Sequence, residues 1–198
     1  MDVLRLKQRV LPGVASLRVY ERLFAVMILS AYTISAPRVA AQSDLGEYDV
    51  KAAFLFNFAK FVDWPDASFA DARRPIVIGA LGENPFGDGL DRIVAGQTVK
   101  GRTIRIDKYR FGDDLRACHI LFISESEQAH VPKILASLQG ANVLTVSDID
   151  GFAKGGGVVQ FVLEENKVHF VINLDSATRA KLKINSKLLA LAQVIGTK

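Results

Sequence analysis

Hydrophobic residues recur every three or four positions over residues 47–64, which predicts an amphipathic helix. Ser43 or Asp44 can cap its N-terminus, and Pro65 follows its last turn. On a helical wheel most of its large apolar side chains share one arc of about 140°. This predicted buried face consists of Val50, Phe54, Leu55, Phe58, Phe61 and Val62.

Phe56 falls outside the predicted buried face, between Lys60 and Asp63 on the polar side of the wheel. A helix with one buried face needs no aromatic side chain there. Two interpretations stay open: Phe56 contacts a partner protein with Lys60 beside it, or it packs under the loop that follows Pro65. Phe56 and Lys60 are therefore candidate partner-binding residues.

Beyond Pro65 the pattern changes to short apolar runs that alternate with helical segments. The predicted strands are residues 75–81, 103–109, 119–124, 142–146, 158–163 and 167–173. The predicted helices are residues 90–95, 126–139 and 176–195, the last with a break near 183–186 left open. Strands that alternate with helices are typical of parallel βαβ units, and residues 164–166 join two strands into a hairpin. We predict a single α/β domain with a mixed, mostly parallel sheet, helices on both faces and a C-terminal β-hairpin.

The N-terminus has the pattern of a secretory signal peptide. A basic stretch up to Arg22 precedes an uncharged apolar run over residues 23–36, and residues 39–41 offer small side chains for cleavage after Ala41. An uncleaved membrane anchor is the alternative, although the run is shorter than the ~20 residues that span a bilayer. We predict a signal peptide over 1–41, a domain over 42–198 and export to the periplasm.

Charge and cysteine content exclude several classes of protein. The chain has 198 residues, and its whole net charge of +4 falls within residues 1–41. The charge-balanced remainder has no electrostatic reason to bind nucleic acid. Cys118 is the single cysteine, which excludes an internal disulfide and a thiolate-rich zinc site. It adjoins an apolar run, so we expect a buried, inert thiol.

Familiar catalytic motifs are missing from the sequence, and we expect no catalytic residue and no cofactor. The glycine-rich segment 79–89 follows a strand as a phosphate-binding loop does, but Asp88 and Gly89 stand where Lys and Ser or Thr are needed. We interpret it as a turn that needs positive φ. Glu164, Glu165 and His169 could meet across the hairpin, but a solvated hairpin end is the better interpretation, so no metal site is predicted.

A small-ligand site is one hypothesis for the glycine-rich segments. In a parallel sheet, ligands bind at the carboxyl ends of the strands. Three glycines in a row also allow a close backbone approach to a ligand or to another strand, although a flexible loop leading into the strand is the simpler interpretation. The candidate ligand-binding residues are Gly82, Asn84, Ser124, Gly155, Gly156 and Gly157.

The predicted last helix carries Arg179, Lys183 and Lys187 at intervals of four. On a continuous helix this spacing aligns three positive charges on one stripe. Such a stripe is either a solvated face or a docking surface for an acidic partner or anionic headgroups. The three residues join the candidate partner-binding set.

Several segments together resemble the YfiR family. They are KAAFLFNFAKFVDWP from Lys51, PIVIGALGENPFGDGL, CHILFIS, GFAKGGGVVQFVLEENKVHFVINLDSA and LKINSKLLALAQV, in this order. The resemblance implies a periplasmic homodimer that binds the periplasmic sensor region of an inner-membrane diguanylate cyclase and holds it inactive. It also implies an outer-membrane lipoprotein that can sequester the repressor. Family members often carry cysteine pairs, so the single Cys118 argues against disulfide-dependent control here.

The sequence therefore predicts a regulatory binding protein that lowers cyclic di-GMP and biofilm formation, not an enzyme. The alternative is a periplasmic small-ligand sensor that feeds a membrane signalling protein. A secreted hydrolase is disfavoured because no nucleophile and base stand out.

Overall fold

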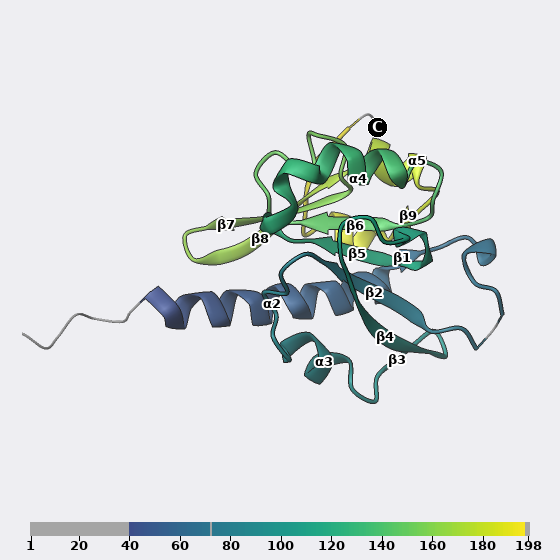
Figure 1. The fold of residues 1–198 in the computed structure, drawn as a ribbon, viewed down its shortest axis with the longest axis horizontal. Coiled ribbons are helices and arrows are strands. Elements are labelled where there is room, and N and C mark those ends of the chain that lie inside the picture. Colours follow the sequence, from purple (N-terminus) through teal and green to yellow (C-terminus); the bar gives the residue numbers. More distant parts are fainter. Residues whose placement is uncertain (1–39, 72, 197–198) are drawn as a thin grey trace, which may run out of the picture. The chain divides into compact units, whose positions relative to one another are not determined.

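The computed structural model describes residues 40–71 and 73–196 (Figure 1). The predicted signal peptide, residues 1–41, lies outside this part except for its last two residues. The α-helices are α2 (Ala40–Phe61), α3 (Gly89–Val94), α4 (Val131–Ser137), α5 (Leu174–Arg179) and α6 (Ser186–Leu189). The 3₁₀ helices are η1 (Asp66–Ser68), η2 (Leu115–Ala117) and η3 (Glu125–His130). The strands are β1 (Val62–Asp63), β2 (Ile76–Leu81), β3 (Thr98–Val99), β4 (Arg102–Tyr109), β5 (Ile120–Ile123), β6 (Leu144–Ser147), β7 (Val159–Glu164), β8 (Lys167–Asn173), β9 (Lys183–Ile184) and β10 (Gln193–Ile195).

Eight strands form one sheet in the order β10-β8-β7-β6-β5-β2-β4-β3. Every pair is parallel except β7 with β8 and β3 with β4. In Figure 1, α2 and α3 lie on one side of the sheet and α4 lies on the other. The predicted fold class, a mixed and mostly parallel sheet with helices on both faces, is confirmed.

The core has two layers, one on each face of the sheet. Strand β5 shows why, because its four residues are all buried and alternate between the layers. Ile120 and Phe122 join the layer under α2, and Leu121 and Ile123 join the layer under α4. Leu55 and Phe58 of α2 and Ile134 of α4 complete the two layers from outside. The continuous apolar run was therefore a correct sign of a central strand.

The ends of α2 differ from the prediction. The helix begins at Ala40, so Ser43 and Asp44 lie inside it and are not its caps. It ends at Phe61 because the next two residues form β1, which pairs antiparallel with β9. Trp64 lies beyond the helix, where its indole Nε1 donates to the carbonyl of His119 at 3.1 Å.

The buried face of α2 is also rotated from the predicted one. Val50 is 45% exposed, whereas Lys51, Ala52 and Ala59 are buried. The wheel counted only large apolar side chains, and the small alanines are the ones that let the helix approach the sheet closely. Phe56 consequently flanks the buried face and packs partly against the core.

The C-terminal hairpin is confirmed. Strands β7 and β8 pair over six residues, from Val159 opposite Ile172 to Glu164 opposite Lys167. Only Glu165 and Asn166 remain as the loop, and both have positive φ, 50° and 60°. Two left-handed residues in a row are typical of a type I′ turn, whose twist matches that of the strands.

The predicted helix over 176–195 is wrong. The chain instead forms α5, β9, α6 and β10. Lys181 turns the chain out of α5 with φ of 56°, and buried Leu182 follows it. Asn185 then starts α6 by accepting a hydrogen bond from the backbone N–H of Lys187 at 2.9 Å. The break near 183–186 was a correct signal, and the helical pattern around it was misleading.

The predicted helix over 126–139 is also only partly correct. Its first half is the 3₁₀ helix η3, which Ser124 caps by accepting from the N–H of Ser126. Pro132 is compatible with the first turn of α4, which follows. Within residues 40–71 and 73–196, no helix is long and apolar enough to cross a membrane.

Candidate functional site at the carboxyl edge of the sheet

The carboxyl ends of β2, β5 and β6 lie side by side, since the three strands are parallel neighbours. Two hollows open at this edge, with volumes of about 360 and 520 Å³. Tyr48 of α2 and Glu125 and Gln128 of η3 line both of them. This is the edge at which α/β sheets place their ligand sites.

A buried lysine is the main polar feature of the smaller hollow. Lys51 of α2 is 3% exposed. Its Nζ lies 2.5 Å from Glu47 Oε1, one helical turn away, and 2.7 Å from Asp148 Oδ2, just after β6. A buried charge costs several kcal/mol unless it is paired, and here two carboxylates surround it. This charged cluster of Glu47, Tyr48, Lys51 and Asp148 joins the first helix to the centre of the sheet.

Tyr48 completes the charged cluster. Its hydroxyl donates to Asp148 Oδ2 at 2.9 Å, and its ring lies 4.4 Å from Lys51 Nζ. Burial, reinforced by the Asp148 carboxylate, raises the pKa of Tyr48 well above its usual value, so the phenol stays neutral. The second oxygen of Asp148, Oδ1, is buried without a hydrogen-bond partner among the described residues.

The sequence analysis missed this charged cluster. One signal was available, since Glu47 and Lys51 are spaced as an ion pair on one helix face. Nothing in the sequence connects Asp148 to them, because the tertiary fold makes that contact.

Gly82, Asn84 and Ser124 do meet at this edge, but their polar groups support the local structure. Gly82 has φ of 88°, and a Cβ there would lie 2.4 Å from Ser126 Oγ. Glycine is therefore required both by the backbone conformation and by the lack of space for a side chain. Asn84 holds its own loop, donating to the carbonyl of Gly87 and accepting from the N–H of Phe86, both at 3.1 Å. The positive φ predicted for the glycine-rich turn is confirmed at Gly82 and Gly87.

Gly155, Gly156 and Gly157 are not part of this edge, so the predicted ligand-binding set is not brought together. The chain returns across the sheet before β7, and Gly156 lines a different hollow, between α4 and α5. Gly157 is required for packing, since a Cβ there would lie 2.1 Å from the buried ring of Phe152.

The predicted partner-binding residues also divide. Arg179, Lys183 and Lys187 lie on α5, β9 and α6, so the continuous stripe is wrong. Lys183 is opposite Asp63 in the β1–β9 pair, directly after α2, and α6 packs against α2. Exposed Lys60 lies with its Nζ 4.0 Å from the ring centre of Phe56. Four of the five residues therefore gather around the C-terminal end of α2, and Arg179 lies apart from them.

Two buried groups at the opposite, amino edge of the sheet are unsuited to catalysis. Burial raises the pKa of the Cys118 thiol to about 11, which keeps it protonated, and the expected burial of this residue is confirmed. Burial lowers the pKa of His119 to about 4, against a weaker opposite effect of the Ser68 backbone. Its Nδ1 accepts from the N–H of Val77 at 3.1 Å, so the neutral ring carries its proton on Nε2.

The described residues therefore place exposed lysines around the end of α2 and inert groups in the buried part of the sheet. Among residues 40–71 and 73–196, no three His, Cys, Asp or Glu side chains are grouped to hold a metal ion. Lys51 forms ion pairs with Glu47 and Asp148 at the carboxyl edge, and burial holds the Tyr48 phenol beside them neutral. This arrangement can hold elements together and can present surfaces to other molecules.

Comparisons with known proteins agree with the motifs in the sequence. A family model described as YfiR/HmsC-like matches residues 48–193, from Tyr48 in α2 to Gln193, the first residue of β10. One similar solved structure is a conserved domain protein from Vibrio cholerae O1 biovar El Tor strain N16961. The two chains are 10% identical with a TM-score of 0.45, and the match covers 60% of this chain and 54% of that one. This chain thus matches about half the length of that protein.

Proposed function

Because the chain belongs to the YfiR/HmsC-like family, we propose that it binds the periplasmic region of an inner-membrane diguanylate cyclase and represses it. The family is regulatory and non-catalytic, and it is linked to periplasmic control of such cyclases. Repression lowers cyclic di-GMP and biofilm formation. The single observation that carries the proposal is the family match, which spans the domain from α2 to β10.

The proposed mechanism is a shift of a binding equilibrium. A repressor that binds the inactive conformation of the sensor region more tightly than the active one raises the inactive population. The shift is limited by the ratio of the two affinities, and moving a population from 1:99 to 99:1 takes a ratio of about 10⁴. No catalytic group is needed for this mechanism.

We place the partner surface around the C-terminal end of α2. Lys60, Lys183 and Lys187 are exposed there, and within the described residues none of them forms an ion pair. The nearby Asp63 is engaged by Lys100. Positive charge of this kind, beside the half-buried ring of Phe56, favours an acidic partner with an apolar contact point.

A clean deletion of the gene in its own host tests the function. Cyclic di-GMP, measured by mass spectrometry in cell extracts, is expected to rise, and biofilm mass with it. Complementation with the full chain should restore both values. An unchanged cyclic di-GMP level under conditions in which the protein is expressed would overturn the repressor proposal.

Capture from envelope extract tests the partner and the surface together. The full chain should retain a diguanylate cyclase that has a periplasmic region. The triple variant Lys60→Glu, Lys183→Glu, Lys187→Glu should not retain the cyclase. The difference from the unaltered chain should be largest at low ionic strength, because salt screens the attraction between exposed charges. The matched control reverses three exposed lysines elsewhere: Lys108, Lys133 and Lys154. Equal retention by both triple variants would exclude this surface.

Phe56 separates an interface role from a core role. Phe56→Ala should weaken partner binding about thirtyfold, the effect of losing an anchor worth about 2 kcal/mol, with only a small fall in melting temperature. A large fall in melting temperature with normal binding of the folded fraction would assign the ring to the core alone.

Export and assembly belong to the same proposal. We infer cleavage after Ala41, a mature chain that begins at Gln42, a homodimer in solution, and sequestration by an outer-membrane lipoprotein. The intact mass of the periplasmic protein checks the cleavage site, and light scattering checks the dimer. A full-length product retained in the membrane fraction would contradict the proposed localisation.

A further inference from the structure

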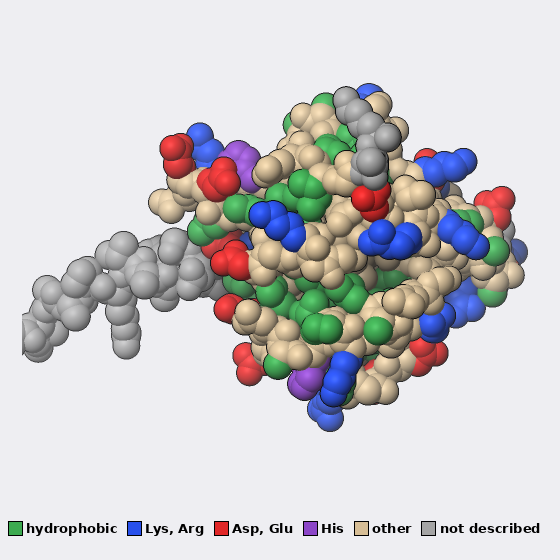
Figure 2. Space-filling view, turned by 90° about the horizontal axis from the view of Figure 1, so that it is seen from above, with side chains coloured by type: hydrophobic (Ala, Val, Ile, Leu, Met, Phe, Trp, Pro, Cys, Tyr) green, Lys and Arg blue, Asp and Glu red, His purple; other side chains and the backbone are tan. Residues whose placement is uncertain are grey.

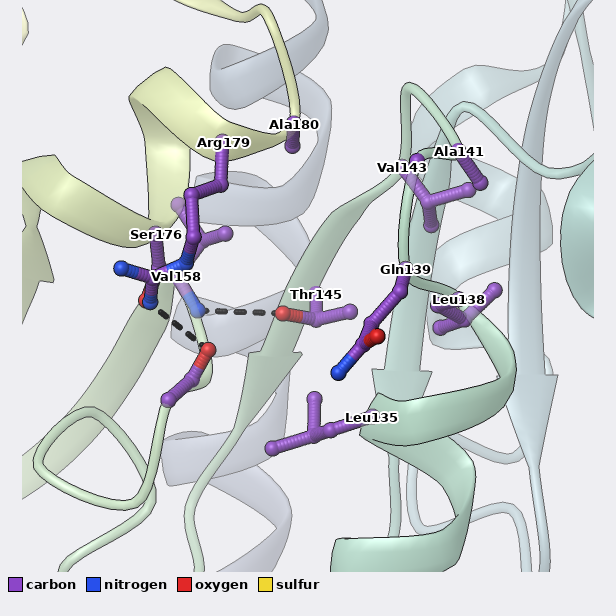
Figure 3. Close-up of a pocket in the computed structure, with 12 residues that line it drawn as sticks. Leu135, Leu138, Gln139, Ala141, Val143, Thr145, Val158, Ser176, Arg179 and Ala180 are labelled. Atoms are coloured by element: carbon purple, nitrogen blue, oxygen red, sulfur yellow. Dashed lines mark hydrogen bonds between the residues drawn. The ribbon is translucent and has the colours of Figure 1, made fainter.

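A third hollow, with a volume of about 460 Å³, opens between α4 and α5 (Figure 3). It lies at the amino end of β6 and β7, away from the carboxyl edge and its charged cluster. Figure 2, which views the molecule from the side that carries α4 and α5 in Figure 1, shows hydrophobic side chains in a hollow with Lys and Arg side chains around it. Its volume lies within the ~300–1,000 Å³ of small-molecule sites.

Six of the twelve residues that line this hollow are apolar, and the other six are polar, charged or glycine. Leu135 of α4 and Leu138, directly after α4, line it on one side, and Val143 and Val158 lie near the sheet. Three of these four side chains are buried, so the floor is fixed by the core and is not an accident of surface side chains. Because these three side chains are already covered, the apolar body of a ligand would gain free energy mainly by covering the partly exposed Leu135, Ala141 and Ala180.

Two hydroxyl groups at the hollow are already committed to the protein. Thr145 Oγ1 accepts from the N–H of Val158 at 3.0 Å, and Ser176 Oγ donates to the carbonyl of Gly156 at 2.8 Å (Figure 3). Specific polar contacts to a ligand are therefore left to Arg179 and Gln139, whose side chains extend toward the hollow from opposite sides.

Arg179 is the only charged residue among those that line the hollow. Its Nη2 donates to Ser176 Oγ at 2.8 Å, which holds the guanidinium at the wall. No Asp or Glu of the described residues forms an ion pair with it. A guanidinium has five N–H donors in a fork that suits a carboxylate, and most of them remain available here.

We propose that this hollow is a binding site for a small amphipathic carboxylate, whose apolar body covers Leu135, Ala141 and Ala180 and whose carboxylate pairs with Arg179. Gln139 can donate its side-chain amide to the second carboxylate oxygen. The site goes beyond the proposed repressor function, and its failure would leave that function untouched because binding is measured without the partner.

The test uses 4-phenylbutyrate as the probe and its neutral amide, 4-phenylbutanamide, as the matched compound. Amide chemical shifts of the isotope-labelled exported protein are followed during titration. The expected result is saturable shifts at Val143, Thr145, Val158 and Ala180, with the amide binding about tenfold more weakly. That factor corresponds to the loss of one charge-assisted pair.

Two variants locate the site. Arg179→Gln should weaken the carboxylate about tenfold and leave the neutral amide unchanged, whereas Arg73→Gln, an exposed arginine elsewhere, should change neither. Leu135→Trp should fill the half-open hollow and abolish binding of both compounds, with the melting temperature unchanged. Absence of shifts at these amides up to about 10 mM probe would overturn the proposal, as would equal affinity for acid and amide. So would shifts confined to another region of the protein.

Discussion

Replacing Lys51 with methionine keeps an unbranched side chain, one heavy atom shorter, and removes the ammonium group with its charge. In the structure Lys51 is almost fully buried between Glu47 and Asp148, with N–O distances of 2.5 and 2.7 Å. Breaking a buried pair costs about 3–5 kcal/mol, since a carboxylate is left without compensation. The side chains of Glu47 and Asp148 are 17% and 12% exposed, so water can partly solvate them and we expect the lower end, about 3 kcal/mol. For a domain of this size the melting temperature should fall by about 6–12 °C.

Urea unfolding measures this change, and an unaltered m-value would show that the unfolded state is not responsible. Lys60→Met is the matched control: an exposed lysine of the same helix, expected to cost less than about 1 kcal/mol. Adding Asp148→Asn to Lys51→Met should recover about 1 kcal/mol or more, because the uncompensated charge is removed. A Lys51→Met protein within about 1 kcal/mol of wild type would refute the assignment of this cluster as a stabilising link.

Three further predictions concern buried groups. Folding lowers the pKa of His119 from 6.5 to about 4, so the unfolded chain takes up the proton first as the pH falls. The free energy of unfolding should therefore be unaffected by His119 above pH 6.5. Between pH 6.5 and 4 it should fall by up to about 3 kcal/mol. His119→Gln should remove that part of the pH dependence, and an identical pH profile for both proteins in urea unfolding would contradict it. The Cys118 thiol, with its pKa of about 11, should react with Ellman's reagent only after unfolding; rapid labelling of the native protein would show an accessible thiol. Gly157→Ala should lower the melting temperature strongly, since its Cβ would overlap the Phe152 ring. Gly46→Ala, at an exposed position of α2, should leave the melting temperature unchanged or raise it slightly. Calorimetry of the two variants decides between a packing role and a flexible loop for the glycine triplet.

The sequence predicted best those elements whose pattern is decided locally. Strand β5 is buried on both faces and reads as an unbroken apolar run, and the hairpin around Asn166 has its own turn signal. The C-terminal segment was mispredicted because its charges repeat every four residues and Lys181, which turns the chain out of α5, is not a typical helix-ending residue. The N-cap residue Asn185 was the local signal for a break, but it did not outweigh the helical pattern around it.

The candidate sites were harder to predict for a different reason. Three glycines look alike in a sequence whether they approach a ligand or a ring, and only the tertiary structure places Phe152 against Gly157. Likewise, Asp148 joins Lys51 and Tyr48 from a distant part of the chain. The hollow between α4 and α5 is lined by three separate segments, residues 135–145, 156–158 and 176–180, so no local pattern could indicate it.

The pairing of β1 with β9 has a consequence for the order of folding. Val62, directly after α2, is opposite Ile184, more than 120 residues later in the chain. The N–H of Asn185 donates to the carbonyl of Phe61 at 2.9 Å. Bringing β1 and β9 together closes a long loop, which costs conformational entropy, so this pair is expected to form late in folding. A growing or translocating chain therefore cannot pack the C-terminal end of α2 in its final position until the segment that contains β9 has emerged. A chain truncated before β9 should remain a substrate for proteases, however complete its central sheet.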